Sequence, residues 1–196
     1  MKKLLIISSP SGGGKSTVTK HILSKFPEFE FSISATTRAQ RENEIDGKNY
    51  FFITKEEFLF KIADNQFIEY ERIFDNYYGT LKSHINGILE NNKFVIFDID
   101  VKGALSIKKI YDKEALLLFL LPPSFDVLQE RLKLRGTESS EQIKNRLARY
   151  RDEIEKINEF DIRIINDVLE NTLLEVENVI NENFNIKNSN IIIPKP

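Results

Sequence analysis

The sequence predicts an α/β fold in which a parallel sheet is flanked by helices, because three observations agree. Four segments are continuous apolar runs rather than alternating patterns, as in strands that are buried on both faces. Helical patterns separate these runs, and strands that alternate with helices build parallel, doubly wound sheets. A glycine-rich segment directly follows the first run. The four runs are Leu4–Ser8, Phe94–Asp98, Ala115–Leu121 and Ile162–Ile165.

Five segments have the apolar periodicity and the boundary residues of helices. The third begins after Pro122-Pro123, where Ser124 is placed to act as its N-cap. The fourth is long and highly charged, and the fifth closes the fold. The predicted helices cover residues 17–26, 101–110, 124–135, 140–157 and 171–184.

Residues 34–89 interrupt this alternation, and we expect them to form an inserted lobe of mixed α+β type. The tail after residue 184 is assigned to no element. The elements expected in the lobe are strands at 50–53 and 67–74 and a helix at 55–64. The predicted division of the chain is a single domain of residues 1–196, made of a core of 1–33 and 90–196 around the lobe.

The bulk properties of the chain restrict its partners and its environment. A net charge of -2 argues against a general nucleic-acid binder, although a local basic pocket is still permitted. The absence of cysteine excludes disulfides and thiolate metal sites. No stretch approaches the ~18 consecutive apolar residues of a membrane-spanning helix. We expect a cytoplasmic protein that binds neither nucleic acid nor membrane, and the sequence leaves a homodimer open.

The glycine-rich segment 9–16 has the features of a nucleotide-phosphate cradle. Glycines let successive backbone N–H groups turn toward an anion, and the following helix N-terminus adds partial positive charge. In such a loop Lys15 would reach the donor phosphates, and the Ser16 hydroxyl would bind Mg²⁺. The alternative is a glycine-rich turn with a surface lysine. The expected ATP-binding residues are Ser11, Gly12, Gly13, Gly14, Lys15, Ser16 and Thr17.

One position departs from the pattern G-x-x-x-x-G-K-[ST] of phosphate-binding loops. Ser9 stands where the first glycine is usual, while the inner glycines, Lys15 and Ser16 are intact. A serine fits this position if its backbone φ is negative, because positive φ strains every residue except glycine.

A second set of motifs lies in the inserted lobe. They are Ser34-Ala35-Thr36-Thr37-Arg38-Ala39-Gln40-Arg41, then Glu44, Gly47, Tyr50 and Phe52, and later Phe67-Ile68-Glu69-Tyr70 and Asn76-Tyr77-Tyr78-Gly79-Thr80. Together with the glycine loop, their order and spacing resemble the guanylate kinase family from Leu4 to about Asp167. The resemblance implies a P-loop NTPase-type parallel sheet, an inserted monophosphate-binding lobe, a helical lid, and Mg²⁺-dependent phosphorylation of GMP and dGMP by ATP.

The resemblance also implies roles for single residues. The positions that match its acceptor-phosphate ligands are Arg38, Arg41, Tyr50 and Tyr78, and those that match its guanine ligands are Ser34, Glu69 and Thr80. Asp98 and Asp100 match an Asp-Ile-Asp motif near the acceptor and the metal, where Asp98 would act on Mg²⁺ indirectly. Lys102 stands where the family often has glutamine.

These residue types suit the two parts of GMP. Guanidinium forks and phenol hydroxyls hold a phosphate dianion without offering a nucleophile. A carboxylate at Glu69 can accept the N1–H and N2–H₂ donors of guanine together, whereas adenine would leave it unpaired. Thr80 and Ser34 would donate to O6. Each residue alone could instead be structural, with Arg38 and Arg41 in a solvated turn and Glu69 on an exposed strand face.

The segment from about 135 to 150 resembles the mobile lid of the family. Arg131, Arg135 and Arg146 match arginines that would neutralise charge on the transferred phosphoryl group. The other charges of this helix are more simply explained as a solvated face. No general base is needed, because the acceptor phosphate is already ionised. The expected catalytic residues are Lys15, Arg38, Arg131, Arg135 and Arg146.

Two other functions stay open at this point. One is a kinase for AMP, UMP or CMP, from which Glu69 and Thr80 distinguish the GMP enzyme. The other is a binding module of the same fold that recognises peptides without catalysis. Such modules resemble this chain in the lobe but have lost the donor loop, which is present here.

Overall fold

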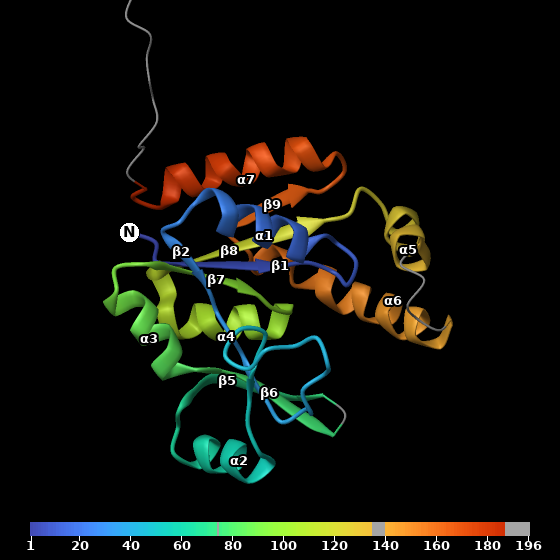
Figure 1. The fold of residues 1–196 in the computed structure, drawn as a ribbon. Coiled ribbons are helices and arrows are strands. Elements are labelled where there is room, and N and C mark those ends of the chain that lie inside the picture. Colours follow the sequence, from blue (N-terminus) through green and yellow to red (C-terminus); the bar gives the residue numbers. More distant parts are fainter. Residues whose placement is uncertain (74, 135–139, 187–196) are drawn as a thin grey trace, which may run out of the picture.

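A five-stranded parallel sheet forms the centre of the molecule, in a computed structural model that describes residues 1–73, 75–134 and 140–186 (Figure 1). Its strand order is β2-β7-β1-β8-β9, and every neighbouring pair is parallel. The predicted α/β class is confirmed, and so are the four predicted strands with their predicted bounds. The strands are β1 (Leu4–Ser8), β2 (Phe29–Phe31), β7 (Phe94–Asp98), β8 (Ala115–Leu121) and β9 (Ile162–Ile165).

The edge strand β2 was not predicted from the sequence. It has three residues, of which only Phe29 is buried, so it lacks the continuous apolar run of the inner strands. The Phe29 ring packs against Phe94 and Phe184, with ring centroids 5.3 and 5.0 Å away. Aromatic contacts across the fold therefore hold this strand in place, and a local sequence pattern does not report them.

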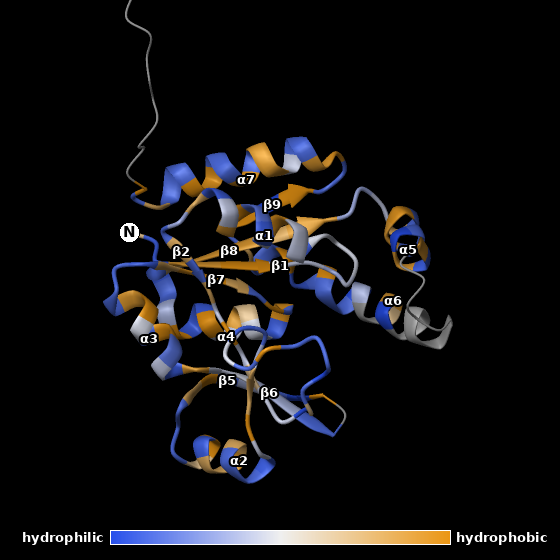
Figure 2. Ribbon diagram, in the orientation of Figure 1, coloured by the Kyte–Doolittle hydropathy of each residue, from blue (hydrophilic) through white to orange (hydrophobic). Residues whose placement is uncertain are grey.

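The two faces of the sheet carry separate apolar cores, because side chains alternate along each strand. Leu4 and Ile6 of β1 lie in one core cluster, while Leu5 and Ile7 lie in the other. Helices α3 and α4 cover the first face, and α1 and α7 cover the second (Figure 1). Figure 2 shows the apolar strands enclosed between helices with polar outer surfaces. These helices are α1 (Lys15–Lys25), α3 (Lys82–Glu90), α4 (Val101–Tyr111) and α7 (Leu169–Asn183).

The predicted helices are present, with small shifts at their ends. Helix α1 begins at Lys15, two residues before the predicted start, because Gly14 is its N-cap. The predicted cap of α5 (Phe125–Leu134) is confirmed, since the Val127 N–H donates to the Ser124 hydroxyl at 3.2 Å. Helix α6 (Ser140–Glu155) ends just before a short 3₁₀ turn. Within the described residues no helix combines the length and apolar composition needed to cross a membrane.

A smaller mixed sheet forms the centre of the lobe, in the order β4-β3-β6-β5. Strand β3 pairs parallel with β4 and antiparallel with β6, and β6 pairs antiparallel with β5. The predicted mixed α+β character is therefore confirmed. The elements are β3 (Ala35–Thr36), β4 (Phe51–Phe52), α2 (Lys55–Ala63), β5 (Phe67–Ile73) and β6 (Asn76–Leu81).

Helix α3 was not predicted, and its residues 82–89 lie within the stretch that the sequence assigns to the lobe. Gly87 lies inside it and weakens the helical pattern in the sequence. Ile85 and Ile88 are buried in the core cluster of the main sheet, so α3 packs on the core. Its His84 ring also contacts the Phe51 ring of the lobe, with centroids 5.2 Å apart. The helix forms because tertiary packing outweighs its modest intrinsic preference.

The lobe has its own small core, in which Phe58 of α2 is the central side chain. Phe58 is fully buried and packs with Ala35 and Phe67. Its ring stacks on Phe67 with centroids 4.3 Å apart and lies 5.3 Å from the Tyr77 ring. Since few other apolar groups are buried here, the lobe depends strongly on this one ring.

Replacing this ring should destabilise the lobe. We expect Phe58→Ala to lower the free energy of unfolding by about 3–5 kcal/mol, because it removes a buried ring and leaves a cavity. Urea denaturation measures the change. Phe60→Ala on the same helix is the matched control, since Phe60 is 65% exposed. Equal losses in the two variants would contradict this account of the lobe core.

Candidate active site

The donor loop, residues 9–14, connects β1 to α1 at the carboxyl edge of the parallel sheet. Gly14 has φ 97°, a left-handed conformation that suits glycine, and it caps α1. The turn is closed by a hydrogen bond from the Gly13 N–H to the Pro10 carbonyl, at 2.8 Å. The helix N-terminus is thereby aimed at the loop, as in anion-binding sites.

Ser9 fits the first loop position without backbone strain. It is not among the described residues with positive φ, which confirms the expectation for a serine there. Lys15 Nζ donates to the Ser9 carbonyl at 2.9 Å and lies 3.3 Å from the Ser9 hydroxyl. A Cβ at Gly13 would lie only 2.6 Å from that hydroxyl. The serine therefore occupies space that a side chain at position 13 would need.

Ser16 and Asp98 meet at the start of α1. The Ser16 hydroxyl donates to Asp98 Oδ2 at 2.9 Å, across 82 residues of sequence. The contact follows from the sheet, because Ile7 at the end of β1 pairs with Asp98 at the end of β7. A hydroxyl and a carboxylate are the hard oxygen groups that suit Mg²⁺, so these residues fit a magnesium ion bound with donor phosphates.

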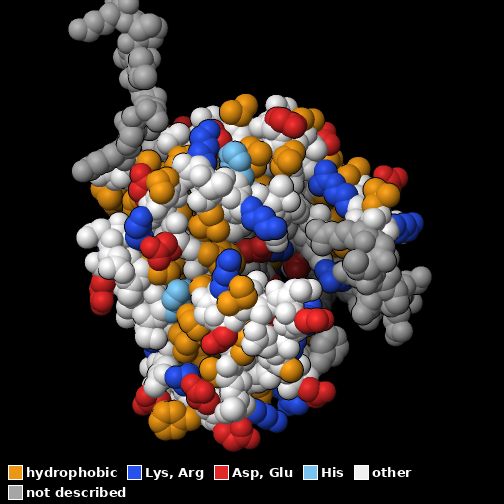
Figure 3. Space-filling view, viewed as in Figure 1, with side chains coloured by type: hydrophobic (Ala, Val, Ile, Leu, Met, Phe, Trp, Pro, Cys, Tyr) orange, Lys and Arg blue, Asp and Glu red, His pale blue; other side chains and the backbone are white. Residues whose placement is uncertain are grey.

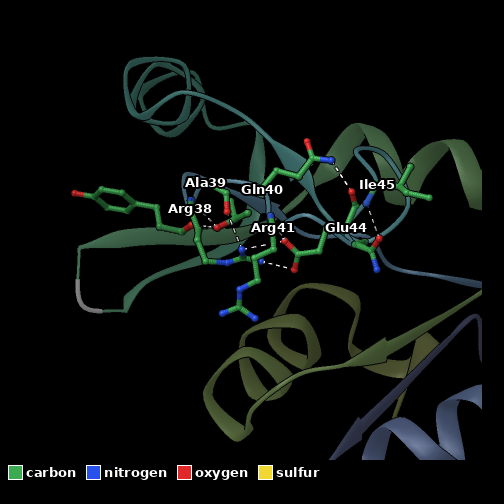
Figure 4. Close-up of polar contacts among 9 residues, drawn as sticks. Arg38, Ala39, Gln40, Arg41, Glu44 and Ile45 are labelled. Carbon is green, nitrogen blue, oxygen red and sulfur yellow. Dashed lines mark hydrogen bonds and ion pairs between the residues drawn. The ribbon is translucent and has the colours of Figure 1, made fainter. Parts of the chain in front are cut away.

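Arg38 is held by Glu44 through two parallel hydrogen bonds (Figure 4). Nη1 donates to Oε2 at 3.0 Å and Nη2 to Oε1 at 2.6 Å, and Nη1 also donates to the Ala39 carbonyl at 2.8 Å. The Arg41 backbone N–H donates to the same carboxylate at 2.9 Å. The hydrogen bond from Arg38 is the main reason that the pKa of Glu44 lies below its ordinary value.

One edge of the Arg38 guanidinium is not used by Glu44 or Ala39. Its bonds to Glu44 and Ala39 use three of its five N–H donors. Nε and the second hydrogen of Nη2 form the remaining edge. The hydrogen bond to Glu44 is the main reason that the pKa of Arg38 is raised, and a side-chain hydrogen bond with Tyr78 adds to the rise. The guanidinium carbon is 5.4 Å from the Tyr50 ring centroid and 5.7 Å from that of Phe52. Arg38 can therefore bind a phosphate without releasing Glu44.

Tyr50, Tyr78 and Arg41 surround the same region. The two phenol rings are 6.1 Å apart, and burial raises the pKa of Tyr50, so its hydroxyl stays a neutral donor. The negative charge of Asp98 adds slightly to that rise, which links this region to the donor side. The Arg41 side chain is exposed and points away from Glu44 (Figure 4). The structure thus brings the four predicted phosphate ligands to one end of the lobe.

Glu69 and Thr80 face each other on neighbouring strands. The Thr80 hydroxyl, which is fully buried, donates to Glu69 Oε1 at 2.6 Å. Burial raises the pKa of the Glu69 carboxyl; the Thr80 hydrogen bond opposes the rise, and the charge of Asp100 adds to it. The carboxylate lines a cleft with Asp100, Lys102 and Gly103 at the start of α4.

The cleft lies between the core and the lobe. Figure 3 shows a hollow there, with Asp or Glu side chains inside it and Lys or Arg side chains around it. Asp100 is fixed at its edge as the N-cap of α4, where its Oδ1 accepts the Gly103 N–H at 2.8 Å. Ser34 lies half-buried between β2 and β3, and its backbone carbonyl accepts the Phe51 N–H at 2.9 Å. No hydrogen bond of the described residues uses its side chain.

The predicted lid arginines are only partly described. Arg146 of α6 donates through Nη1 to the Ser11 hydroxyl, so it reaches the donor loop. Arg131 of α5 contacts the Asp167 carbonyl at 3.5 Å. The predicted catalytic residue Arg135 lies outside the described residues.

This arrangement matches a known family. The family model described as guanylate kinase matches residues 1–183. The chain belongs to the guanylate kinase family. The guanylate kinases of Porphyromonas gingivalis and Chlorobium luteolum are 51% and 46% identical to it; the alignments cover 86% and 87% of this chain and 91% and 87% of those proteins. The crystal structure of guanylate kinase from Anaplasma phagocytophilum is similar, with TM-score 0.72, 28% identity, and coverage of 93% of this chain and 87% of that one.

Glu44 belongs to the lobe motif, but the sequence alone indicates no role for it. Its carboxylate holds Arg38 and the Arg41 backbone together. The sequence contained a signal for such a contact, because Glu44 lies six positions after Arg38 and three positions after Arg41 in a polar turn. Spacing alone did not distinguish it from Glu42, which is exposed.

Removing the charge of Glu44 should weaken acceptor binding selectively. We expect Glu44→Gln to raise the KM for GMP roughly tenfold, because Arg38 loses its charge-assisted clamp, while the KM for ATP changes by less than about twofold. Steady-state kinetics with each substrate varied in turn measures both values. Glu42→Gln is the matched control. A parallel rise of both KM values would show that Glu44 acts on the fold and not on the acceptor site.

Proposed function

We propose that this chain catalyses transfer of the γ-phosphoryl group of ATP to GMP, giving ADP and GDP. The observation that carries the proposal is a buried carboxylate, Glu69, bonded to Thr80 in a lobe that faces an intact donor loop. A donor loop alone would support any phosphotransferase, whereas this pair specifies the acceptor base. Membership of the guanylate kinase family and 51% identity to a guanylate kinase support the same activity.

The donor loop and α1 would bind the ATP phosphates. Backbone N–H groups of residues 11–17 and the Lys15 ammonium supply positive charge at the helix N-terminus. Lys15 bonds to Ser9 in this structure and would extend to the phosphates when ATP is bound. Arg146, which reaches Ser11, and the predicted lid residues Arg131 and Arg135 would add charge over the transferred group.

Ser16 and Asp98 would hold Mg²⁺, Ser16 directly and Asp98 through its contact with Ser16. When bound, this ion neutralises negative charge on the donor phosphates. Magnesium with ATP is the general requirement of the family, and the assignment to these two residues is our proposal.

The acceptor phosphate would be aligned by Arg38, Arg41, Tyr50 and Tyr78. Arg38 is held against Glu44 and the aromatic rings, so its donors point in one direction before GMP binds. Because these donors are already in place, binding of the acceptor phosphate would also align its attacking oxygen with the donor. The phosphate attacks as a dianion, so no side chain needs to remove a proton.

Guanine would be read in the cleft next to α4. Glu69 would accept the N1–H and N2–H₂ donors in place of the Thr80 hydroxyl. The single hydrogen of Thr80 would then turn away from Glu69 and, together with that of Ser34, be donated to O6. Adenine offers neither donor, and an unpaired buried carboxylate costs about 1–3 kcal/mol or more. Asp100, fixed as the α4 cap, would add an acceptor at the edge of the cleft.

The division into a GMP-binding lobe at 34–89 and a lid at about 135–150 is part of this proposal. Closure of lobe and lid would exclude water and suppress ATP hydrolysis. A peptide-binding module is the less favoured alternative, because Lys15, Ser16 and Asp98 keep the arrangement that a donor nucleotide needs. The use of dGMP, a homodimer and a cytoplasmic location remain predictions from the sequence.

A substrate comparison tests the activity. We expect a coupled assay with ATP and Mg²⁺ to show turnover of GMP and dGMP, with AMP, CMP and UMP slower by about 10⁴-fold in kcat/KM. Equal turnover of AMP would refute the assignment of guanine. Absence of turnover with every monophosphate would favour the binding module.

The buried charge of Glu69 predicts opposite effects on binding and stability. Glu69→Gln should raise the KM for GMP about 10–100-fold, because an amide cannot accept both guanine donors. It should also raise the Tm at pH 7. The folded-state pKa of Glu69 is raised by burial, so its ionised form destabilises the fold above that pKa. A gain of ~1 kcal/mol corresponds to about 2–4 °C.

The stabilisation by Glu69→Gln should depend on pH. It should shrink as the pH falls toward 4.5, the ordinary pKa of a glutamate carboxyl. Near that pH the Glu69 carboxyl becomes protonated in the folded and in the unfolded protein, so its charge no longer destabilises the fold. Thermal unfolding of the parent and the variant from pH 4 to 8 measures it. Glu56→Gln, at an exposed position of α2, is the control. A lower Tm for Glu69→Gln, or an equal loss of ATP binding, would make Glu69 a structural residue.

A further inference from the structure

A buried asparagine at the carboxyl end of the edge strand β9 reaches the donor loop. Asn166 directly follows β9, and its backbone N–H donates to the Leu121 carbonyl of β8 at 2.7 Å. Its side chain crosses to the loop, where Nδ2 donates to the Gly13 carbonyl at 2.8 Å. Asn166 is only 6% exposed, so water does not compete with this bond.

The Gly13 carbonyl matters because it shares a peptide plane with the Gly14 N–H. In a trans peptide these two groups point in opposite directions. A loop that presents its N–H groups to phosphates must therefore turn its carbonyl groups outward, where each needs a donor. Asn166 supplies that donor for Gly13.

The space around Gly14 is adapted to this contact. A Cβ at Gly14 would lie 2.3 Å from Asn166 Nδ2, closer than any side chain could tolerate. Glycine at position 14 is therefore required both by its positive φ and by the asparagine amide beside it.

Thr172 of α7 fixes the orientation of the amide. Its hydroxyl lies 3.1 Å from Asn166 Oδ1, and Thr172 is 1% exposed. The nearby Val168 carbonyl already accepts the Thr172 backbone N–H at 3.1 Å. A flipped amide would set Oδ1 against the Gly13 carbonyl, two acceptors facing each other. The Thr172 hydroxyl also lies 3.2 Å from the Val168 carbonyl and 3.5 Å from the Ile165 carbonyl. The Gly13 carbonyl can only accept, so Nδ2 faces the loop and Oδ1 faces the Thr172 hydroxyl.

We propose that Asn166, oriented by Thr172, is a positioning residue that sets the donor loop for binding nucleotide phosphates. It does not touch the reacting atoms; it holds the Gly13–Gly14 peptide with the N–H directed to the phosphates. The inference deepens the proposed function, because it concerns the donor side of the same reaction.

The test separates donor from acceptor binding. Asn166→Asp keeps the shape of the side chain but sets a carboxylate oxygen against the Gly13 carbonyl. We expect ADP affinity, measured by calorimetric titration, and the KM for ATP to worsen about tenfold or more, with the KM for GMP changed less than twofold. Asn183→Asp on α7 is the matched control, since Asn183 Nδ2 also donates to a backbone carbonyl, that of Val179, at 2.9 Å.

A second pair of variants keeps the test decisive if Asn166→Asp does not fold. Thr172→Val removes the hydroxyl at nearly constant shape and should weaken ADP binding in the same direction, while Thr172→Ser should restore it. Unchanged ADP affinity in Asn166→Asp would overturn the proposal. If Asn166→Asp does not fold, unchanged ADP affinity in Thr172→Val would overturn it. Equal losses of affinity for ADP and for GMP would also overturn it. The ADP titration needs no GMP turnover, so failure of the GMP kinase assignment would be seen separately.

Discussion

Parallel pairing of β1 with β7 and β8 is the constraint on which the site depends. In a parallel sheet the carboxyl ends of the strands lie at one edge, so the segments that leave them meet there. Ile7 pairs with Asp98, and the donor loop therefore lies beside the acidic end of β7 before any side chain contributes. A slip of one residue would exchange the two buried cores on either side of β1. Hydrophobic burial thus fixes the register that the polar site needs.

The acceptor side is organised differently, because the lobe has a small core. Its key polar side chains are fixed by one another: Glu44 holds Arg38, and Thr80 holds Glu69. Glu44 fixes the Arg38 guanidinium through two hydrogen bonds within the protein, so its order does not depend on a ligand. Glu69 carries the opposite cost, since an ionised carboxylate in a buried site destabilises the fold. In the proposed function, the same buried carboxylate that destabilises the fold selects the guanine base.

The glycines of the donor loop leave space for neighbouring side chains as well as for a phosphate. Ser9 fills the volume that a side chain at position 13 would occupy, and the Asn166 amide does the same at position 14. The serine that departs from the usual loop pattern is thus accommodated by the residue type four positions later. Substitutions in this loop are therefore coupled, and the tolerance of one position depends on the others.

The sequence by itself determined four of the five strands of the main sheet, the donor loop and most of the helices. A strand buried on both faces is a continuous apolar run, and a phosphate cradle is a local run of glycines before a helix, so both are visible in a short window. Only the tertiary structure decided β2, the packing of α3 on the core, and the partners of the site residues. The Asn166–Gly13 bond spans 153 positions and the Ser16–Asp98 bond spans 82. Such contacts depend on strand order and register, which bring distant segments together only after the chain has folded.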